Sequence, residues 1–198
     1  MKIRLTIAAA ALGVAAATML GLAAAAPANA DTAPPAQPAQ PAQQTASPAL
    51  SGSAPSVLVN FNSNDCLGIL GGADDAPAVQ WPCNGSPDQS WTLGSEYSDS
   101  AYFQIVNGDG QCLGVLGGST GEGASVYGWT CLGPSHPDQY WTLLGSGTSG
   151  YSYLLNLNSG LVLGVLGNST AQGASVVQWA NQNTPNNQLW TPEATPSS

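Results

Sequence analysis

Catalysis by proton transfer at neutral pH would depend on one residue of this sequence, because His136 is its only histidine. It lies beside prolines in the segment LGPSHP at 132–137, which has the composition of an exposed loop. A serine nucleophile would need a strand-to-helix elbow, and none accompanies this histidine. Paired carboxylates for glycoside cleavage would need a cleft of fixed spacing. The sequence therefore predicts a protein that is not an enzyme.

Positive side chains are confined to the N-terminus. Lys2 and Arg4 are the only Lys and Arg among 198 residues, whereas Asp and Glu number 11, which gives a formal net charge of −9. The rest of the chain can neither neutralise phosphates nor bind an anionic membrane through a basic patch. We therefore exclude nucleic acids and membrane surfaces as partners.

Residues 1–30 have the pattern of a secretory signal peptide. The two basic residues precede an Ala- and Leu-rich run at 5–26, and an Ala-Asn-Ala triplet at 28–30 forms a cleavage site. The apolar run is long enough for a membrane anchor, which is the alternative interpretation. Its alanine content, Pro27 and the cleavage site favour removal, so we expect a secreted, extracellular protein.

Residues 31–55 form a linker of Pro, Ala, Gln and Ser with almost nothing to bury. Its PAQPAQPAQ run favours extended, polyproline-like conformations over a packed fold. Such a disordered tether could hold the following domain away from a cell wall, or it could be a passive spacer without a partner. We favour the passive spacer.

The rest of the chain, residues 56–193, consists of three similar repeats. They lie at about 56–97, 101–146 and 152–193. Each has a Leu-Gly motif, a Gly- and Ala-containing turn, a first tryptophan and a closing Gln-x-Trp. The closing tryptophans are Trp91, Trp141 and Trp190, whose numbers differ by 50 and by 49. This regularity indicates threefold internal duplication.

Short strands must position these motifs. Apolar or alternating runs at 57–61, 102–106 and 153–157 are bounded by Asn, Gly, Ser and Asp, as strands are. The glycine content and the lack of a 3.6-residue apolar period argue against helices. One repeat cannot bury its apolar face alone, so we predict an all-β assembly in which three four-stranded repeats close on one another.

The four cysteines follow the same repeat plan. Cys66 and Cys83 bracket the middle of the first repeat, and Cys112 and Cys131 bracket that of the second. Repeat symmetry and export favour the disulfide bonds Cys66–Cys83 and Cys112–Cys131. A zinc site is disfavoured by the wide spacing and the single histidine, so we predict no metal and no cofactor.

This set of motifs resembles the ricin B-type lectin family, whose fold is a β-trefoil. The resemblance covers residues 56–193, and the triple Gln-x-Trp motif is specific to the family. It is similar to the secreted bacterial members, which occur alone or beside catalytic domains as carbohydrate-binding modules. The resemblance implies that the closing tryptophans Trp91, Trp141 and Trp190 lie in the core where the repeats meet.

In that family each sugar pocket combines an aromatic platform with planar polar groups. The aromatic two residues before the second cysteine stacks on the sugar ring, and it matches Trp81, Trp129 and Trp179. The residue before the Gln-x-Trp glutamine adds a hydrogen bond, and it matches Asp88, Asp138 and Asn187. The glutamines themselves, with a bracing role and some contact beside the sugar, are Gln89, Gln139 and Gln188.

The principal clamp of the family is missing. It is an aspartate two residues after the first cysteine, and its positions hold Gly68, Gly114 and Gly164. A polar residue two positions before the platform is replaced as well, by Val79, Tyr127 and Val177. Losing one hydrogen bond to a charged group costs about 1.5–3 kcal/mol, which can abolish a weak site.

Two functions are consistent with this loss. The domain binds neutral glycans in up to three weak sites, with replacement acceptors such as Asp74 and Asp75 in the first repeat and Glu122 in the second. Alternatively, it is a trefoil that has lost sugar binding and serves as a protein-interaction or structural module. We favour a monomeric module that binds a neutral polysaccharide or glycan.

Overall fold

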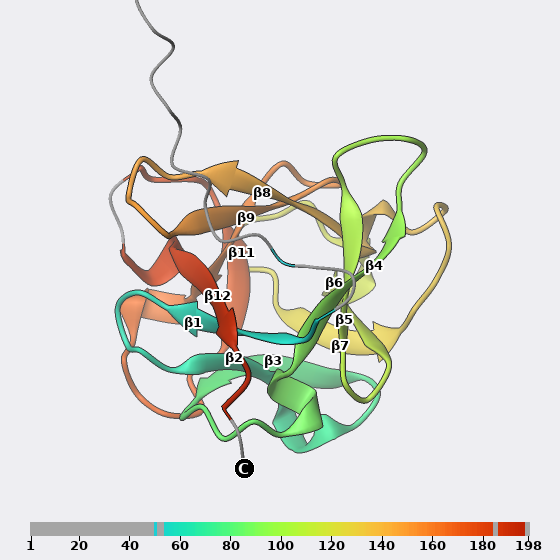
Figure 1. Ribbon diagram of the computed structural model, residues 1–198. Coiled ribbons are helices and arrows are strands. Elements are labelled where there is room, and N and C mark those ends of the chain that lie inside the picture. Colours follow the sequence, from blue (N-terminus) through green and yellow to red (C-terminus); the bar gives the residue numbers. More distant parts are fainter. Residues whose placement is uncertain (1–49, 51–53, 184–185, 197–198) are drawn as a thin grey trace, which may run out of the picture. The chain divides into compact units, whose positions relative to one another are not determined.

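The computed structural model describes residue 50, residues 54–183 and residues 186–196 (Figure 1). Within these ranges the chain forms twelve β-strands and six short 3₁₀ turns and no α-helix. The strands are β1 (Ser56–Asn60), β2 (Cys66–Ile69), β3 (Ala76–Trp81), β4 (Trp91–Glu96), β5 (Phe103–Asn107), β6 (Gln111–Val115), β7 (Val126–Thr130), β8 (Tyr140–Gly145), β9 (Ser152–Asn156), β10 (Val162–Val165), β11 (Val176–Trp179) and β12 (Trp190–Ala194). The turns are η1 (Leu70–Gly72), η2 (Pro87–Gln89), η3 (Leu116–Gly118), η4 (Pro137–Gln139), η5 (Leu166–Asn168) and η6 (Asn186–Gln188).

The strands pair in the same way in every repeat. The second and third strands form an antiparallel hairpin, as β2–β3, β6–β7 and β10–β11. The long pairs β4–β5, β8–β9 and β12–β1 join each repeat to the next, so that the last strand of the chain lies beside the first (Figure 1). All twelve strands thereby belong to one sheet. This confirms the predicted all-β, threefold assembly.

The first strand of each repeat is displaced by one residue from the prediction. The runs at 57–61 and 153–157 form one residue earlier, as β1 and β9, and the run at 102–106 forms one residue later, as β5. At the end of β1 the side chain of Asn60 accepts a hydrogen bond from the N–H of Asn62 at 3.0 Å and starts a turn. An asparagine that caps its own turn therefore ends the strand before the apolar run ends.

The closing tryptophans are the largest buried side chains of the core. Trp91, Trp141 and Trp190 are at most 1% exposed. Each indole N–H donates to a backbone carbonyl of its own repeat, at Leu67 (2.9 Å), Leu113 (2.8 Å) and Leu163 (3.2 Å). A buried indole needs such a partner, so these bonds hold each repeat's hairpin against its closing tryptophan.

The core also includes a residue from the segment predicted to be a linker. Leu50 is 3% exposed and belongs to the same apolar cluster as the three closing tryptophans. The predicted signal peptide at 1–30 and nearly all of the linker at 31–55 lie outside the described residues. Among the residues that are described, no helix is long and apolar enough to cross a membrane.

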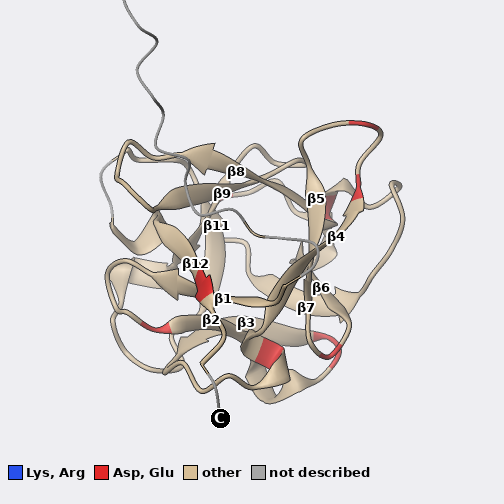
Figure 2. Ribbon diagram, viewed as in Figure 1, with Lys and Arg blue, Asp and Glu red and all other residues tan. Residues whose placement is uncertain are grey.

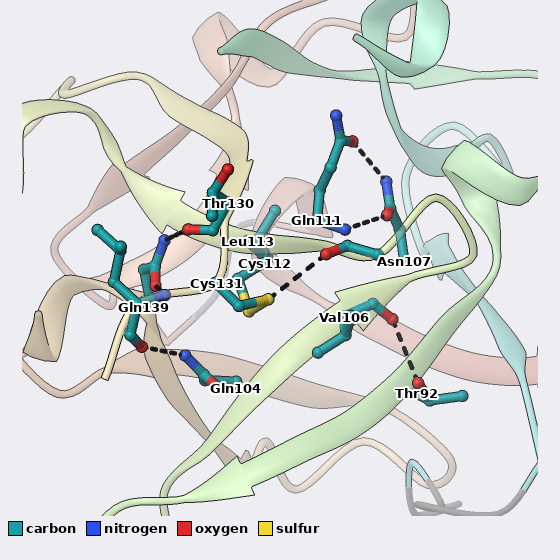
Figure 3. The surroundings of a disulfide bond; sticks show 12 residues. Thr92, Gln104, Val106, Asn107, Gln111, Cys112, Leu113, Thr130, Cys131 and Gln139 are labelled. Atoms are coloured by element: carbon teal, nitrogen blue, oxygen red, sulfur yellow. Dashed lines mark hydrogen bonds between the residues drawn. A yellow bond between two sulfur atoms is a disulfide. The ribbon is translucent and has the colours of Figure 1, made fainter. Parts of the chain in front are cut away.

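Both predicted disulfide bonds are present, which confirms the pairing inferred from the repeats. Cys66 is bonded to Cys83 and Cys112 to Cys131, across 17 and 19 residues of sequence. Each bond joins the start of a hairpin to the segment that follows it; the second is drawn in Figure 3. Closing loops of this length stabilises a fold by about 3 kcal/mol on the chain-entropy account.

Candidate binding site

The first tryptophan of each repeat lies at the end of its hairpin's second strand or one residue before that end. Trp81 and Trp129 lie opposite Cys66 and Cys112 in the strand register, and Trp179 lies opposite Val162. Trp81 is 43% exposed and Trp129 is 37% exposed, in contrast to the buried closing tryptophans. These rings are therefore available to a ligand.

Two of these tryptophans line cavities at equivalent places in the second and third repeats. The second-repeat cavity has a volume of about 810 Å³ and the third-repeat cavity about 450 Å³. The second-repeat cavity is lined by the expected residues Trp129, Asp138 and Gln139. The third-repeat cavity is lined by the expected residues Trp179, Asn187 and Gln188. The groups expected to form a site are thus brought together in both repeats.

The glutamine of each Gln-x-Trp motif is buried and braces its repeat. The amide of Gln139 donates to the carbonyl of Thr130 (3.0 Å, Figure 3) and accepts from the N–H of Leu132 (2.7 Å). The amides of Gln89 and Gln188 make the corresponding pairs of bonds. Because backbone groups occupy both ends of these amides, the glutamines shape the pockets.

The glycine at the clamp position is required by this packing. A Cβ atom placed on Gly114 would lie 2.9 Å from Cγ of Gln139, and one on Gly68 would lie 3.0 Å from Cγ of Gln89. The third repeat has the same close approach, at 2.9 Å, above Gly164. The glutamine therefore packs directly on the strand backbone, and an aspartate cannot enter without displacing it.

Asp138 points its carboxylate at the place where the missing clamp would begin. Its Oδ2 atom lies 3.5 Å from a Cβ placed on Gly114. The side chain is only 16% exposed, and Nδ1 of His136 lies 4.0 Å from Oδ1. Burial raises the pKa of Asp138, while its own backbone N–H and the charge of His136 lower it. No side chain among the described residues makes a hydrogen bond to this carboxylate.

The residues equivalent to Asp138 in the other two repeats have different hydrogen-bond partners. In the first repeat the carboxylate of Asp88 accepts a hydrogen bond from the hydroxyl of Ser86. In the third repeat the amide of Asn187 donates to the carbonyl of Val165 at 2.8 Å, and its buried Oδ1 has no partner among the described residues. Among the described residues, the second repeat is therefore the one whose acceptor is both charged and without a hydrogen bond from a side chain.

The acidic residues expected as replacement acceptors lie beside the following repeat. Asp74 of the first repeat accepts from the hydroxyl of Thr130 (3.0 Å), and Asp75 lines the second-repeat cavity. Glu122 of the second repeat accepts from the N–H of Ala180 in the third (3.3 Å). The turn before the first tryptophan of one repeat thus lies beside the first tryptophan of the next repeat. This arrangement follows from the way the three repeats close on one another.

His136 contributes to the rim of the second-repeat cavity. Its side chain is 48% exposed, and its ionisable neighbour there is Asp138. Within the part of the chain that the structure describes, no group of three or more His, Cys, Asp and Glu side chains could hold a metal ion.

A family model described as "Ricin-type beta-trefoil lectin domain" matches residues 54–190. Among solved structures, the designed threefold-symmetric protein ThreeFoil is 30% identical, with a TM-score of 0.65 over 70% of this chain and 97% of that one. An exo-β-1,3-galactanase from Clostridium thermocellum is also 30% identical, with a TM-score of 0.65 over 74% of this chain but 31% of the enzyme. A ricin B-like lectin from Macrolepiota procera, solved with lactose, shares the fold at 16% identity, with a TM-score of 0.62 over 74% of this chain and 98% of the lectin. No curated protein matches the sequence.

Proposed function

The chain belongs to the ricin-type β-trefoil lectin family, and from this premise we propose that its domain is a secreted, monomeric, non-catalytic module that binds neutral glycans. A pyranose ring presents one apolar C–H face and a fringe of hydroxyl groups. An aromatic ring can stack on the face while planar acceptors bind the hydroxyls. The domain offers both kinds of group in the same cavities.

The observation that carries the proposal is the meeting of Trp129 and Asp138 in the second-repeat cavity. The indole is exposed, and the neighbouring carboxylate is partly buried without a hydrogen bond from another side chain of the described residues. A desolvated carboxylate gains from hydroxyl donors, and hydrogen bonds to a charged group are the strong, orienting contacts of such a site. Asp138 therefore substitutes for the aspartate that Gly114 replaces.

The three repeats are expected to bind with unequal strength. The first and third repeats offer Trp81 and Trp179 as platforms. However, Asp88 already accepts a hydrogen bond from Ser86, and Asn187 is an uncharged amide whose nitrogen is bonded to Val165. Several weak sites on one domain still give useful avidity on a polymer, because the second contact is intramolecular. We expect the second repeat to dominate binding to a short oligosaccharide.

Charge favours an uncharged ligand over an anionic one. Asp and Glu residues are scattered along the chain of the domain, and its described residues include no Lys or Arg (Figure 2). A carboxylate or sulfate on a sugar would meet Asp75 and Asp138 in the second-repeat cavity, with no Lys or Arg among its lining residues to offset the repulsion. Neutral glycans avoid this cost.

The test is retention of the protein on a glycan array and on insoluble galactose- and xylose-based polysaccharides. Trp129→Ala should lose most of the retention while its thermal midpoint stays near that of the parent. Leu144→Ala is the matched control, because Leu144 is 43% exposed and lies outside both cavities. Absence of binding to every glycan would refute the proposal.

A second candidate function is protein interaction by a trefoil that no longer binds sugar. It is favoured by three exposed leucines at equivalent turns, Leu70, Leu116 and Leu166, which are 52%, 46% and 49% exposed. Leu116 and Leu166 line the second- and third-repeat cavities, so an apolar side chain of a protein partner would pack there in place of a sugar. This function predicts a protein partner, captured from secreted material, that free sugars do not release.

A further inference from the structure

The turn before each first tryptophan contains a residue in the left-handed backbone conformation. In the second and third repeats this residue is glycine, with Gly123 and Gly173 both at φ 76°. In the first repeat it is Asp75, at φ 60°. All three lie six positions before the tryptophan of their own repeat, and glycine adopts this conformation without steric cost. Asp75 is therefore the exception at a position that suits glycine.

The backbone of these residues makes the same contact in each repeat. The N–H of Asp75 donates to the carbonyl of Gly128 at 3.0 Å, just before Trp129. Gly123 and Gly173 donate in the same way to the residues before Trp179 and Trp81, both at 2.9 Å. The backbone bond is thus made equally well by glycine, and the aspartate side chain is not needed for it.

The side chain at this position must lie against the next repeat's platform. A Cβ placed on Gly123 would be 3.1 Å from Cζ3 of Trp179, and one placed on Gly173 would be 3.0 Å from Cζ3 of Trp81. Asp75 carries a Cβ atom at the position where the other two repeats have glycine, and Asp75 and Trp129 line the same cavity. The first repeat thereby supplies a carboxylate to the site of the second.

The first-repeat turn holds Asp75 in place by contacts that do not use its carboxylate. This turn is two residues shorter, since nine positions separate Gly72 from Trp81 but eleven separate Gly118 from Trp129. Gln111 donates to the carbonyl of Gly72 at 3.2 Å, and the carboxylate of Asp74 is bonded to Thr130. Asp74 thus anchors the turn, whereas the carboxylate of Asp75 has no hydrogen-bond partner among the described residues.

We propose that Asp75 is a specificity-determining residue of the second-repeat site, accepting a hydrogen bond from a donor on the bound sugar. This inference rests on the proposed function. Together with Asp138 it gives the site two carboxylates around one exposed indole. The ligand class is therefore a glycan unit that presents donors, either hydroxyl or ammonium groups, and no anionic group.

The test compares Asp75→Gly and Asp75→Asn in full-length protein that also carries Trp81→Ala and Trp179→Ala, so that only the second platform remains. Asp99→Gly is the matched control, because Asp99 is another exposed aspartate in the left-handed region (φ 55°) and lies outside the cavity. The probes are galactose- and xylose-based oligosaccharides, and glucosamine and N-acetylglucosamine oligomers of equal length.

We expect Asp75→Gly to weaken binding by about tenfold or more, since a lost charged hydrogen bond has that effect. Its thermal midpoint should stay equal or rise, because glycine relieves the backbone at this position. Asp99→Gly should show the same stability effect without a change in affinity. If the parent prefers glucosamine oligomers in a salt-sensitive way and Asp75→Asn loses that preference, the donor is an ammonium group. If Asp75→Asn loses affinity equally for glucosamine and N-acetylglucosamine oligomers, and the loss does not depend on salt, the donor is a hydroxyl group.

Two outcomes would overturn the inference, and they are distinguishable. If the parent binds glycan and Asp75→Gly binds it equally well, Asp75 has no role in the site and the proposed function stands. If the parent binds none of the glycans, the proposed function fails and the inference fails with it. A large fall in the thermal midpoint of Asp75→Gly would also contradict it, by making Asp75 structural.

Discussion

Replacing Asp138 by asparagine removes the charge from the second-repeat site and keeps the size of the side chain. The fold tolerates this residue, because Asn187 occupies the equivalent position in the third repeat. The side chain is 16% exposed, and its carboxylate receives no hydrogen bond from another described side chain. Under the proposed function, its partners in the complex are hydroxyl groups of the ligand. A hydrogen bond to a charged group contributes about 1.5–3 kcal/mol, which corresponds to about 10- to 150-fold in affinity.

The pH dependence separates this role from a structural one. Sugar hydroxyls favour the ionised carboxylate, so binding is present above the pKa of Asp138 and is lost as the pH falls through it. Because burial raises that pKa, the loss begins at a higher pH than for an ordinary aspartate. In the free protein the same raised pKa means that ionisation opposes folding at neutral pH. Asp138→Asn should therefore bind more weakly without being less stable.

The assay is isothermal titration calorimetry of the Trp81→Ala/Trp179→Ala protein with a bound oligosaccharide, at several pH values. The parent should lose affinity on acidification, and Asp138→Asn should have a weak affinity that changes little with pH. Asp99→Asn serves as the control for removing an exposed aspartate, and it should match the parent. Equal affinities for Asp138→Asn and the parent at every pH would refute the reasoning.

Three further predictions concern the scaffold. Gly114→Asp should fail to strengthen sugar binding and should destabilise the domain by about 2–4 kcal/mol in urea unfolding, because it displaces the buried Gln139 from two partly buried hydrogen bonds. Tighter binding would contradict the packing at this strand. Leu50→Ala should cost about 2–5 kcal/mol, although Leu50 lies in a segment of low complexity, and an unchanged midpoint would show that it is not part of the core. Replacing Cys112 and Cys131 together by serine should cost about 3 kcal/mol and leave glycan affinity intact once the protein is folded.

The sequence predicts the scaffold well because its signals are repeated. The tryptophan spacing, the Gln-x-Trp motifs and the cysteine positions each occur two or three times, so the all-β fold and both disulfide bonds could be derived from them. The strand ends were less predictable, because an asparagine such as Asn60 ends a strand through a side-chain hydrogen bond and not through a change in hydropathy.

The composition of the site was harder to predict, because it depends on how the repeats close. Asp75 precedes Trp81 in the sequence but lines the cavity of Trp129. A two-residue deletion also hides its equivalence to Gly123. Leu50 is an isolated apolar residue without periodicity, and only the packed core shows that it is buried. Such contacts between repeats leave no local pattern in the chain.

The central claim, that the second-repeat cavity is a carbohydrate site, is tested most directly by nuclear magnetic resonance of the six tryptophan indole N–H groups. The signal of Trp129 is assigned by its absence in the spectrum of Trp129→Ala. During titration with an oligosaccharide that the protein retains, we expect this signal to shift first and most. The signals of the buried Trp91, Trp141 and Trp190 should stay nearly constant. If a bound glycan leaves the Trp129 signal in place, the claim is wrong.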